Sequence, residues 1–350
     1  MIDTVKIYTR IDEHIYKIIR FNSNIKCMYN KASGEVFYEI INDSLEGTYD
    51  SRLSVRVFSG SKYGFIYKNS YCLEIEGSYH KIMKGQNAFN GYYSIQEITN
   101  GFITLVENAY NITLPSLNHW FLCRADLTKC FDLYNQNNVC KYINSLRYLS
   151  YPRRNIKFFE NETLYCAGDV STLKIYNKYL EFCKNDKFKV SKFTNIFDIT
   201  TKIQGFVRFE CEIKKKKLMT IYNKKYLRVT LINYKDLEKV WSDEFMKILK
   251  FDKETYERVK TKEEVVERLN KNFKAGKALR LYQFFITIIN DGYNDVKNKT
   301  SSTSFYRNIS DLKSVGIDFS QNNFEEIPRL DLNNIIDFDP FVWQEVIWYA

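Results

Sequence analysis

The sequence predicts an α+β protein, with an antiparallel sheet in the first two thirds of the chain and a helical domain after it. Up to about residue 218, polar and apolar residues alternate in several segments, which is the period of a half-buried strand. From about Tyr234 the apolar residues recur every three or four positions, as in amphipathic helices. The chain has 350 residues, enough for more than one domain. We therefore expect a sheet-based domain over residues 1–234 and a helical domain over residues 235–350.

The N-terminal part of the sheet domain, residues 1–105, reads as short strands separated by polar turns. Residues 53–58 and 71–78 alternate most regularly. These strands lack a helical layer of their own in this reading. We therefore expect them to complete the sheet of residues 106–234 and not to form a separate domain.

The core of this domain, residues 106–234, contains further strands and one helix. Residues 119–133 and 204–218 alternate, residues 162–168 and 172–176 read as the two strands of a hairpin, and residues 137–149 have helical spacing. Three sets of apolar side chains are expected to face the core: Cys123, Ala125 and Leu127; Val139, Ile143 and Leu146; Phe209, Cys211 and Ile213.

The recognisable unit of the helical domain is residues 278–317. An apolar helix there ends at Gly292, a short element follows, and a last helix runs from about Ser302 to Val315. This is the outline of a helix-turn-helix DNA reader, although any three-helix subdomain shares it. The last helix is expected to present these polar and basic residues outward: Ser304, Arg307, Asn308, Ser310 and Lys313.

The composition indicates a cytoplasmic protein with a basic surface. The formal net charge is +10 and the isoelectric point is near 8.9, which favours nucleic acid or anionic lipid as a partner. The start lacks a signal-peptide pattern, and the most apolar run is far shorter than the roughly 20 residues that span a membrane. Eight cysteines without a CxxC pair, and only three histidines, argue against a zinc site. No GxxxxGK[ST] loop is present, so we expect no nucleotide site.

Three of the predicted strands carry polar or charged groups on one face. The groups are Arg124 and Asp126; Lys174, Tyr176 and Lys178; Arg208, Glu210 and Glu212. If these strands are neighbours, carboxylates, cations and one phenol gather on a single water-accessible surface. Such oxygen-rich clusters suit Mg²⁺ or Mn²⁺, which polarise a phosphoryl oxygen for attack by a hydroxyl. The alternative is the solvated side of a sheet, where ion pairs contribute little.

A tyrosine on this surface is the candidate nucleophile. Because the phenol pKa is about 10, attack at neutral pH needs a metal, a base or nearby cations, which Lys174 and Lys178 could supply. If a helix begins near Asn177, Tyr176 and Tyr179 become neighbours. We favour Tyr176 as the nucleophile and Tyr179 as a packing residue, with a second acceptor role as the alternative. Basic patches that are either functional or simply solvated lie at Arg153 and Arg154, at residues 214–217, and at Lys224 and Lys225.

Five stretches carry a family resemblance: CLEIEGSYHKIMKGQNAFNG, RADLTKCFD, TLKIYNKYLEF, GFVRFECEIK and INDGYNDVKNKTSSTSFYRNISDLKSVGI. They occur in the order seen in phage and plasmid replication proteins of the gene II/X type, the rolling-circle initiators of filamentous phages and their relatives. The resemblance covers about residues 70–317. It implies an antiparallel-sheet nicking domain like that of HUH endonucleases, followed by a winged-helix or helix-turn-helix-like domain. It also implies an endonuclease and ligase that nicks the origin, keeps the 5′ phosphate on a tyrosine, and later rejoins the displaced strand.

The resemblance also implies roles for single residues. The Tyr-x-Lys motif falls on Tyr176 and Lys178, with Tyr176 as the nucleophile. Asp126 and Glu210 are implied as ligands of Mg²⁺ or Mn²⁺. The third ligand would be Glu212 or Glu181, and arginines would neutralise phosphate or hold the carboxylates. The residues expected to contact phosphate or DNA are Arg124, Arg208, Lys174, Arg153, Arg154, Arg307, Asn308 and Lys313. The expected partners are origin DNA, as duplex and as nicked single strand, and a host helicase and polymerase.

Two departures from the family pattern and three alternatives stand beside this interpretation. Gln86 occupies a position where the family often has His, and Ala125 one where a β-branched residue is usual. The alternatives are a non-enzymatic DNA-binding protein such as a repressor, a mobilisation relaxase with the same tyrosine chemistry, and a basic structural protein without a site. The first of these would keep full function in Tyr176→Phe, and the last would bind no divalent metal.

Overall fold

The computed structural model describes most of the chain up to Ile317. The described residues are 1–29, 31–33, 36–46, 52–59, 70–88, 91–146, 151, 154, 156–159, 162–185, 196–249 and 261–317.

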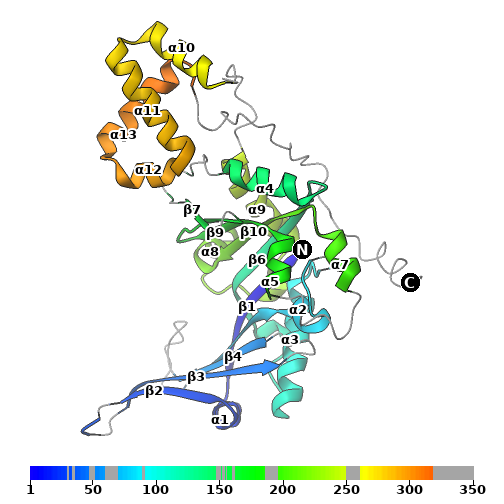
Figure 1. The fold of residues 1–350 in the computed structure, drawn as a ribbon. Coiled ribbons are helices and arrows are strands. Elements are labelled where there is room, and N and C mark those ends of the chain that lie inside the picture. Colours follow the sequence, from blue (N-terminus) through cyan, green and yellow to red (C-terminus); the bar gives the residue numbers. More distant parts are fainter. Residues whose placement is uncertain are drawn as a thin grey trace.

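The centre of the molecule is one sheet of ten strands in the order β2-β3-β4-β5-β1-β6-β10-β9-β8-β7 (Figure 1). All its pairings are antiparallel, which confirms the predicted α+β class with an antiparallel sheet. The strands are β1 (Ile2–Ile11), β2 (Asn24–Tyr29), β3 (Val36–Glu46), β4 (Arg52–Ser59), β5 (Tyr71–Ser78), β6 (Phe121–Asp132), β7 (Ile156–Phe159), β8 (Thr163–Cys166), β9 (Ser171–Asn177) and β10 (Phe206–Lys214). Because β1 pairs with both β5 and β6, the N-terminal strands continue the sheet of the later ones.

The helices are named in chain order. They are α1 (Glu13–Asn22), α2 (Tyr79–Lys84), α3 (Ile95–Tyr110), α4 (Gln136–Ser145), α5 (Lys178–Asn185), α7 (Ile196–Lys202), α8 (Lys215–Tyr222), α9 (Tyr234–Leu249), α10 (Lys262–Asn272), α11 (Ala275–Asp291), α12 (Tyr293–Lys299) and α13 (Ser302–Ser314), with short 3-10 turns η1 (Leu117–His119) and η3 (Val229–Leu231). None of the helices among the described residues is long and apolar enough to cross a membrane.

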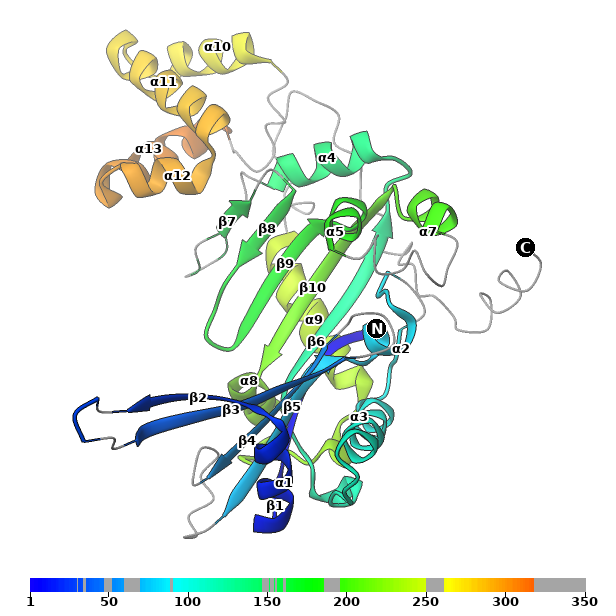
Figure 2. The ribbon, with the colours of Figure 1, turned by 60° about the horizontal axis from the view of Figure 1, so that its bottom comes forward.

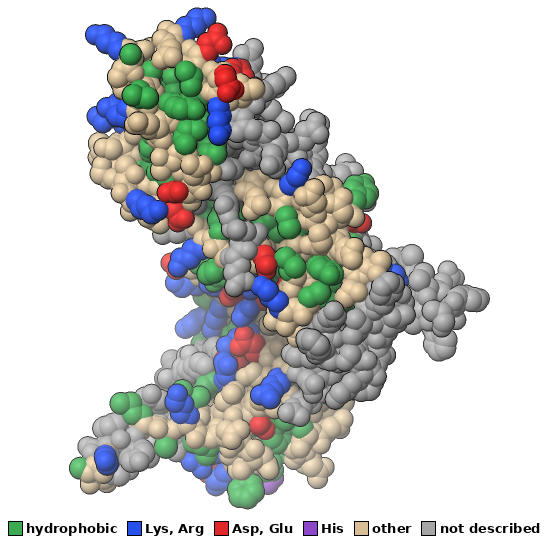
Figure 3. Space-filling view, in the orientation of Figure 1, with side chains coloured by type: hydrophobic (Ala, Val, Ile, Leu, Met, Phe, Trp, Pro, Cys, Tyr) green, Lys and Arg blue, Asp and Glu red, His purple; other side chains and the backbone are tan. Residues whose placement is uncertain are grey.

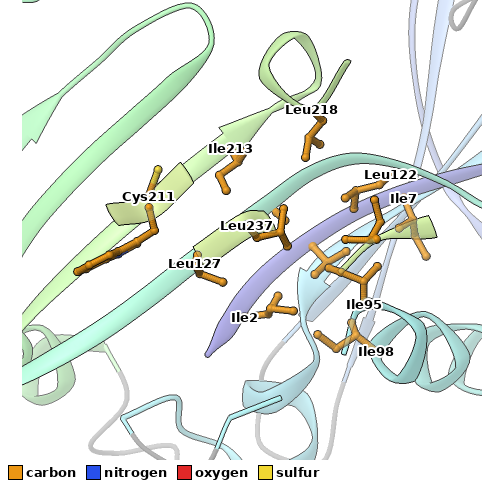
Figure 4. Close-up of a cluster of buried hydrophobic side chains, with 14 of the residues drawn as sticks. Ile2, Ile7, Ile95, Ile98, Leu122, Leu127, Cys211, Ile213, Leu218 and Leu237 are labelled. Atoms are coloured by element: carbon orange, nitrogen blue, oxygen red, sulfur yellow. The ribbon is translucent and has the colours of Figure 1, made fainter. Parts of the chain in front are cut away.

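One face of the sheet packs against α1, α3, α4 and α9 to form the main apolar core. Figure 2 shows α9 behind β10 and β6. In Figure 4, Ile95 and Ile98 of α3 lie beside Ile2 and Ile7 of β1. Two of the predicted apolar sets lie in this core: Val139, Ile143 and Leu146; Phe209, Cys211 and Ile213.

Two helices of the N-terminal part correct the expectation that its strands lack a helical cover. α3 buries Ile95, Ile98, Phe102 and Val106 against the sheet, and α1 buries Ile15 and Ile19. Their spacing of three and four residues is that of an amphipathic helix, so the signal was present in the sequence.

Two strands also depart from prediction. Cys123 does not join the core beside Ala125, because the register of β6 against β1 shifts between Leu122 and Arg124. The Cys123 side chain packs with Tyr8 and Cys72 instead. β10 ends at Lys214, and Lys215 begins α8, so the strand predicted over 204–218 is too long. A run of lysines offers no apolar alternation for a strand and is compatible with helix.

Helices α10 to α13 have an apolar cluster of their own, to which Leu281, Phe285 and Phe305 contribute. Gly292 ends α11 with φ of 91° and Gly316 follows α13 with φ of 76°, conformations that favour glycine. Both helix ends agree with the sequence prediction. Residues 318–350 lie outside the described part of the chain.

Candidate active site

The three strands predicted to carry the site are neighbours in the sheet, in the order β6-β10-β9. Glu212 of β10 lies opposite Asp126 of β6. On the other side of β10, Glu210 lies opposite Lys174 and Arg208 lies opposite Tyr176. The antiparallel register therefore brings the predicted side chains to one face of the sheet.

This face is buried around the tyrosine, which corrects the prediction of a water-accessible surface. Tyr176 is 8% exposed, Glu210 6%, and Arg208 and Lys178 0%. The cover is a second apolar cluster that joins α5 and α7 to the sheet and contains Cys130, Phe182, Ile199 and Ile203. A solvated sheet face therefore does not describe these residues.

Tyr176 is the penultimate residue of β9, and α5 begins two residues later at Lys178. Its Oη donates a hydrogen bond to Glu210 Oε2 at 3.1 Å, and Lys174 Nζ donates to Glu210 Oε1 at 2.7 Å. Burial raises the pKa of Tyr176 well above its usual value; the nearby Arg208 opposes this shift, and Glu210 adds to it. Tyr176 is therefore a protonated phenol whose proton already points at a carboxylate.

Lys178 is fully buried beside the tyrosine and binds two oxygen groups. Its Nζ lies 2.7 Å from Asn87 Oδ1 and 2.5 Å from Glu181 Oε2. Burial would raise the pKa of Glu181, but the charges of Lys178 and Lys81 outweigh it and lower that pKa to about 2. Tyr179, the second candidate tyrosine, packs against the cluster under α5 and α7.

Tyr176 opens into a pocket of about 360 Å³. The lining residues are Asp3, Thr4, Ser78, Lys81, Asn87, Thr163, Lys174, Tyr176, Glu181 and Glu210. The pocket thus combines three carboxylates, two lysines and one phenol: a hydroxyl that can attack phosphorus, carboxylates that can accept its proton, and lysines that can bind a phosphoryl group.

Asp3, Asn87 and Lys81 are pocket residues that sequence reasoning missed. Asp3 Oδ2 lies 3.1 Å from Arg208 Nη2, and Asn87 Nδ2 donates to both carboxylate oxygens of Asp3. Burial opposes ionisation of Asp3, but Arg208 and Lys81 hold its pKa below its usual range. Asn87 lies next to Gln86 within a stretch that carries the family resemblance; nothing in the sequence marks Asp3.

Arg208 holds carboxylate and backbone groups and has no surface left for phosphate. Besides Asp3, it donates to the Asn87 carbonyl at 2.6 Å and to Thr128 Oγ1 at 3.1 Å. The expectation that Arg208 contacts phosphate or DNA does not fit this environment, because the side chain is 0% exposed. The other role predicted for Arg208, holding a carboxylate, does fit this environment. The carboxylate that it holds is Asp3, and not one of the predicted metal ligands.

The predicted metal ligands are not gathered around one point. Arg124 binds Asp126 through two nitrogens, at 2.8 and 2.5 Å, and its Nε lies 3.6 Å from Glu212. Burial raises the pKa of Asp126 to about 7 against the pull of Arg124. Glu210 and Glu181 line the pocket instead. Within the described part of the chain, no three acidic, histidine or cysteine side chains are placed to hold a metal ion.

The remaining predicted DNA contacts have different environments. Arg307 and Lys313 are exposed on α13, as expected. The prediction that Asn308 points outward is wrong: the side chain is 8% exposed and is buried on α13 together with Phe305 and Leu312. Arg154 binds the buried Glu244 at 3.0 Å, and Arg153 lies outside the described residues.

The chain matches a known family over residues 1–231, which includes the whole sheet and the pocket. The family is described as the N-terminal region of the phage replication-associated protein of gene II type. A curated relative, the replication-associated protein of the same type from Salmonella phage IKe, is 24% identical over 339 residues, which cover 85% of this chain and 78% of the relative. No solved structure matches the chain.

Proposed function

Because the chain belongs to the family of gene II-type phage replication-associated proteins, we propose that it is a rolling-circle DNA replication initiator that nicks one strand at an origin and later rejoins it. In this proposal the sheet domain is an HUH-endonuclease-like nicking domain and residues 235–350 form the DNA-binding domain. The partners are origin DNA and a host helicase and polymerase, in the cytoplasm of a bacterial host.

One observation carries the proposal: a buried tyrosine hydroxyl donates to a carboxylate at the wall of a charged pocket, 3.1 Å away. In the nicking step, Tyr176 Oη forms a bond to phosphorus and the bond from phosphorus to the 3′ oxygen breaks. The phenolic proton passes to Glu210, and the 3′ oxygen takes up a proton from water to become a 3′ hydroxyl. A base is needed because burial keeps the pKa of the phenol high.

The covalent product is a 5′ phosphate on Tyr176, which conserves the energy of the broken phosphodiester. Rejoining is the reverse reaction: a 3′ hydroxyl gives its proton to water and attacks phosphorus, the bond from phosphorus to Tyr176 Oη breaks, and Tyr176 takes back a proton from Glu210. No nucleotide is needed for this step, in agreement with the missing GxxxxGK[ST] motif. Lys174, whose Nζ lies 2.7 Å from Glu210 Oε1, would orient that carboxylate and bind the scissile phosphate in this proposal.

Dependence on Mg²⁺ or Mn²⁺ is part of the proposal, since such an ion polarises a phosphoryl oxygen. The carboxylates that line the pocket are Asp3, Glu181 and Glu210; Glu181 and Glu210 belong to the predicted ligand set, and Asp3 does not. These three carboxylates do not surround one point among the described residues. Asp126 and Glu212, which were predicted as ligands from the sequence, therefore stay in the proposal beside them.

The test is to incubate the purified protein with supercoiled DNA of its own replicon and Mn²⁺, and to look for protein covalently attached to a 5′ end. Parallel reactions use EDTA, Tyr176→Phe and Tyr179→Phe. We expect an adduct from the wild type and from Tyr179→Phe, and none from Tyr176→Phe or with EDTA. Tight origin binding without any adduct from the wild type would instead favour a non-enzymatic DNA-binding protein.

A further inference from the structure

A second charged feature lies at the far end of β10. Residues 213–235 contain eight Lys and Arg and no Asp or Glu. Four of these basic side chains are exposed around α8: Lys216, Lys224, Lys225 and Arg228. Figure 3 shows Lys and Arg side chains gathered at mid-height on the left side of the molecule, where Figure 1 places α8.

The segment after α8 is fixed to the sheet beside the start of β6. Leu122 N donates to the Leu227 carbonyl at 2.8 Å, and Val229 N donates to the Trp120 carbonyl at 3.0 Å. These bonds hold Tyr226 in a small aromatic cluster with Tyr8 and Phe121. Tyr8 is fully buried, so Tyr226 and Phe121, both half-buried, are the rings of this cluster that stay partly exposed beside the basic side chains.

Two lysines lie against these rings. Lys215 Nζ is 5.4 Å from the ring centre of Tyr8 and 5.9 Å from that of Tyr226. Lys225 Nζ is 5.4 Å from the ring centre of Tyr226. Cations interleaved with aromatic rings are the surface that holds unpaired nucleotides, with phosphates on the cations and bases on the rings.

In this basic-aromatic patch (Lys215, Lys224, Lys225, Tyr226 and Arg228), Lys215 and Tyr226 lie in the cluster around Tyr8, which is on the same sheet face as Tyr176. Tyr8 and Lys6 are two residues apart on β1 and therefore share a face of the sheet. Lys6 lies opposite Arg124, which is on the site face. Lys214 is six residues beyond Arg208 on β10, a span of about 20 Å at 3.3 Å per residue. Between Tyr176 and α8, the basic side chains of this face form ion pairs with carboxylates: Arg124 binds Asp126, and Lys6 binds Glu74. The excess of basic over acidic residues therefore lies at the α8 end.

We propose that the basic-aromatic patch binds single-stranded DNA a few nucleotides from the strand end held at Tyr176. This inference rests on the proposed nicking function, which produces such a strand. Single-stranded DNA is the expected occupant because only unpaired bases can stack on Tyr226, whereas a duplex would use the lysines alone.

The test measures binding of the full-length protein to a labelled oligothymidine of roughly 16 nucleotides, without origin sequence and with EDTA, at several salt concentrations. For Lys224→Ala/Lys225→Ala, the slope of log affinity against log salt should fall by about 1.4, which is 0.7 per phosphate contact. Tyr226→Leu should weaken binding about tenfold, whereas Tyr226→Phe keeps the ring and should bind like the wild type. The matched control, Lys141→Ala/Lys239→Ala, removes two charges from α4 and α9 on the opposite side of the sheet and should change nothing.

An unchanged salt slope in Lys224→Ala/Lys225→Ala would overturn the inference. So would equal losses in Tyr226→Leu and Tyr226→Phe, or a matching loss of affinity for a duplex of the same length in Tyr226→Leu. The adduct assay on origin DNA runs in parallel. A wild type that forms the adduct but does not bind the oligothymidine would contradict the patch and leave the nicking proposal intact.

Discussion

The two faces of the sheet are buried by different means, and β10 contributes to both. Toward α9 it presents Phe209, Cys211 and Ile213, all 0% exposed. Toward α5 it presents Arg208 and Glu210, at 0% and 6% exposed. Burying apolar side chains stabilises a fold directly, whereas burying charges is costly unless each is paired. An arginine, carboxylates and a tyrosine buried together are therefore better explained by chemistry than by stability.

Removing Arg208 should have the largest effect on stability. Arg208→Met leaves the buried Asp3 without its salt-bridge partner, although Ser78 and Asn87 still donate to it. Losing one partner of a buried pair costs about 3–5 kcal/mol. We expect that decrease in the free energy of unfolding, measured by urea denaturation. Asp3→Asn/Arg208→Met should recover part of it, because no unpaired carboxylate is left. An Arg208→Met variant as stable as the wild type would show that the ion pairs of this face contribute nothing.

The opposite face offers a test of pH dependence at Glu244 of α9. This carboxylate is 1% exposed and accepts hydrogen bonds from Tyr151 Oη and Ser171 Oγ, both at 2.9 Å. Burial alone would raise its pKa, but hydrogen bonds from Lys247, Ser171 and Tyr151 lower it from 4.5 to about 2. Because the folded pKa is the lower one, this stabilisation is present above pH 4.5 and is lost as the pH falls toward 2.

Glu244→Gln should therefore be less stable than the wild type at neutral pH. It should also lose less stability between pH 4.5 and 2, as measured by thermal unfolding at each pH. The matched control is Asp243→Asn, which changes the exposed neighbouring residue on α9. If Glu244→Gln and Asp243→Asn have the same acid dependence, the buried hydrogen bonds do not control it.

On α13, exposed and buried residues should affect different properties. Arg307→Ala and Lys313→Ala should each lower the slope of log affinity for origin duplex against log salt by about 0.9. Asn308→Ala should leave that slope unchanged and alter only the stability of the helical cluster, since Asn308 faces inward. Fluorescence anisotropy at several salt concentrations measures the slopes. Unchanged slopes in both basic variants would contradict a DNA-binding role for this helix.

The smallest effect is expected from Ile213→Val on the apolar face. It should lower the free energy of unfolding by about 0.5–1.5 kcal/mol, because one buried methylene group is lost. Adduct formation at saturating DNA should stay at the wild-type level, since Ile213 faces the core and not the pocket. A large loss of adduct would show that the two faces are not separable in function.

The alternation along β6, β9 and β10 was sufficient to predict which side chains share the site face, because strand geometry has a period of two. It could not predict that Asp3, 205 positions from Arg208, would lie beside it, since register between distant strands is set by the whole fold. Burial of the face was also missed, because α5 and α7 cover it from outside the sheet. The error at Asn308 was avoidable, since its spacing of three from Phe305 places both on one side of a helix.

The most direct test of the central claim identifies the residue that carries the DNA. The adduct is trimmed with nuclease and digested with trypsin, and the modified peptide is sequenced by mass spectrometry. Cleavage after Lys174 and Lys178 separates Tyr176, in the peptide IYNK, from Tyr179, in YLEFCK. We predict a 5′ nucleotide on Tyr176. A nucleotide on Tyr179 or on any other residue would contradict the assignment of Tyr176 and Glu210 as the reacting pair.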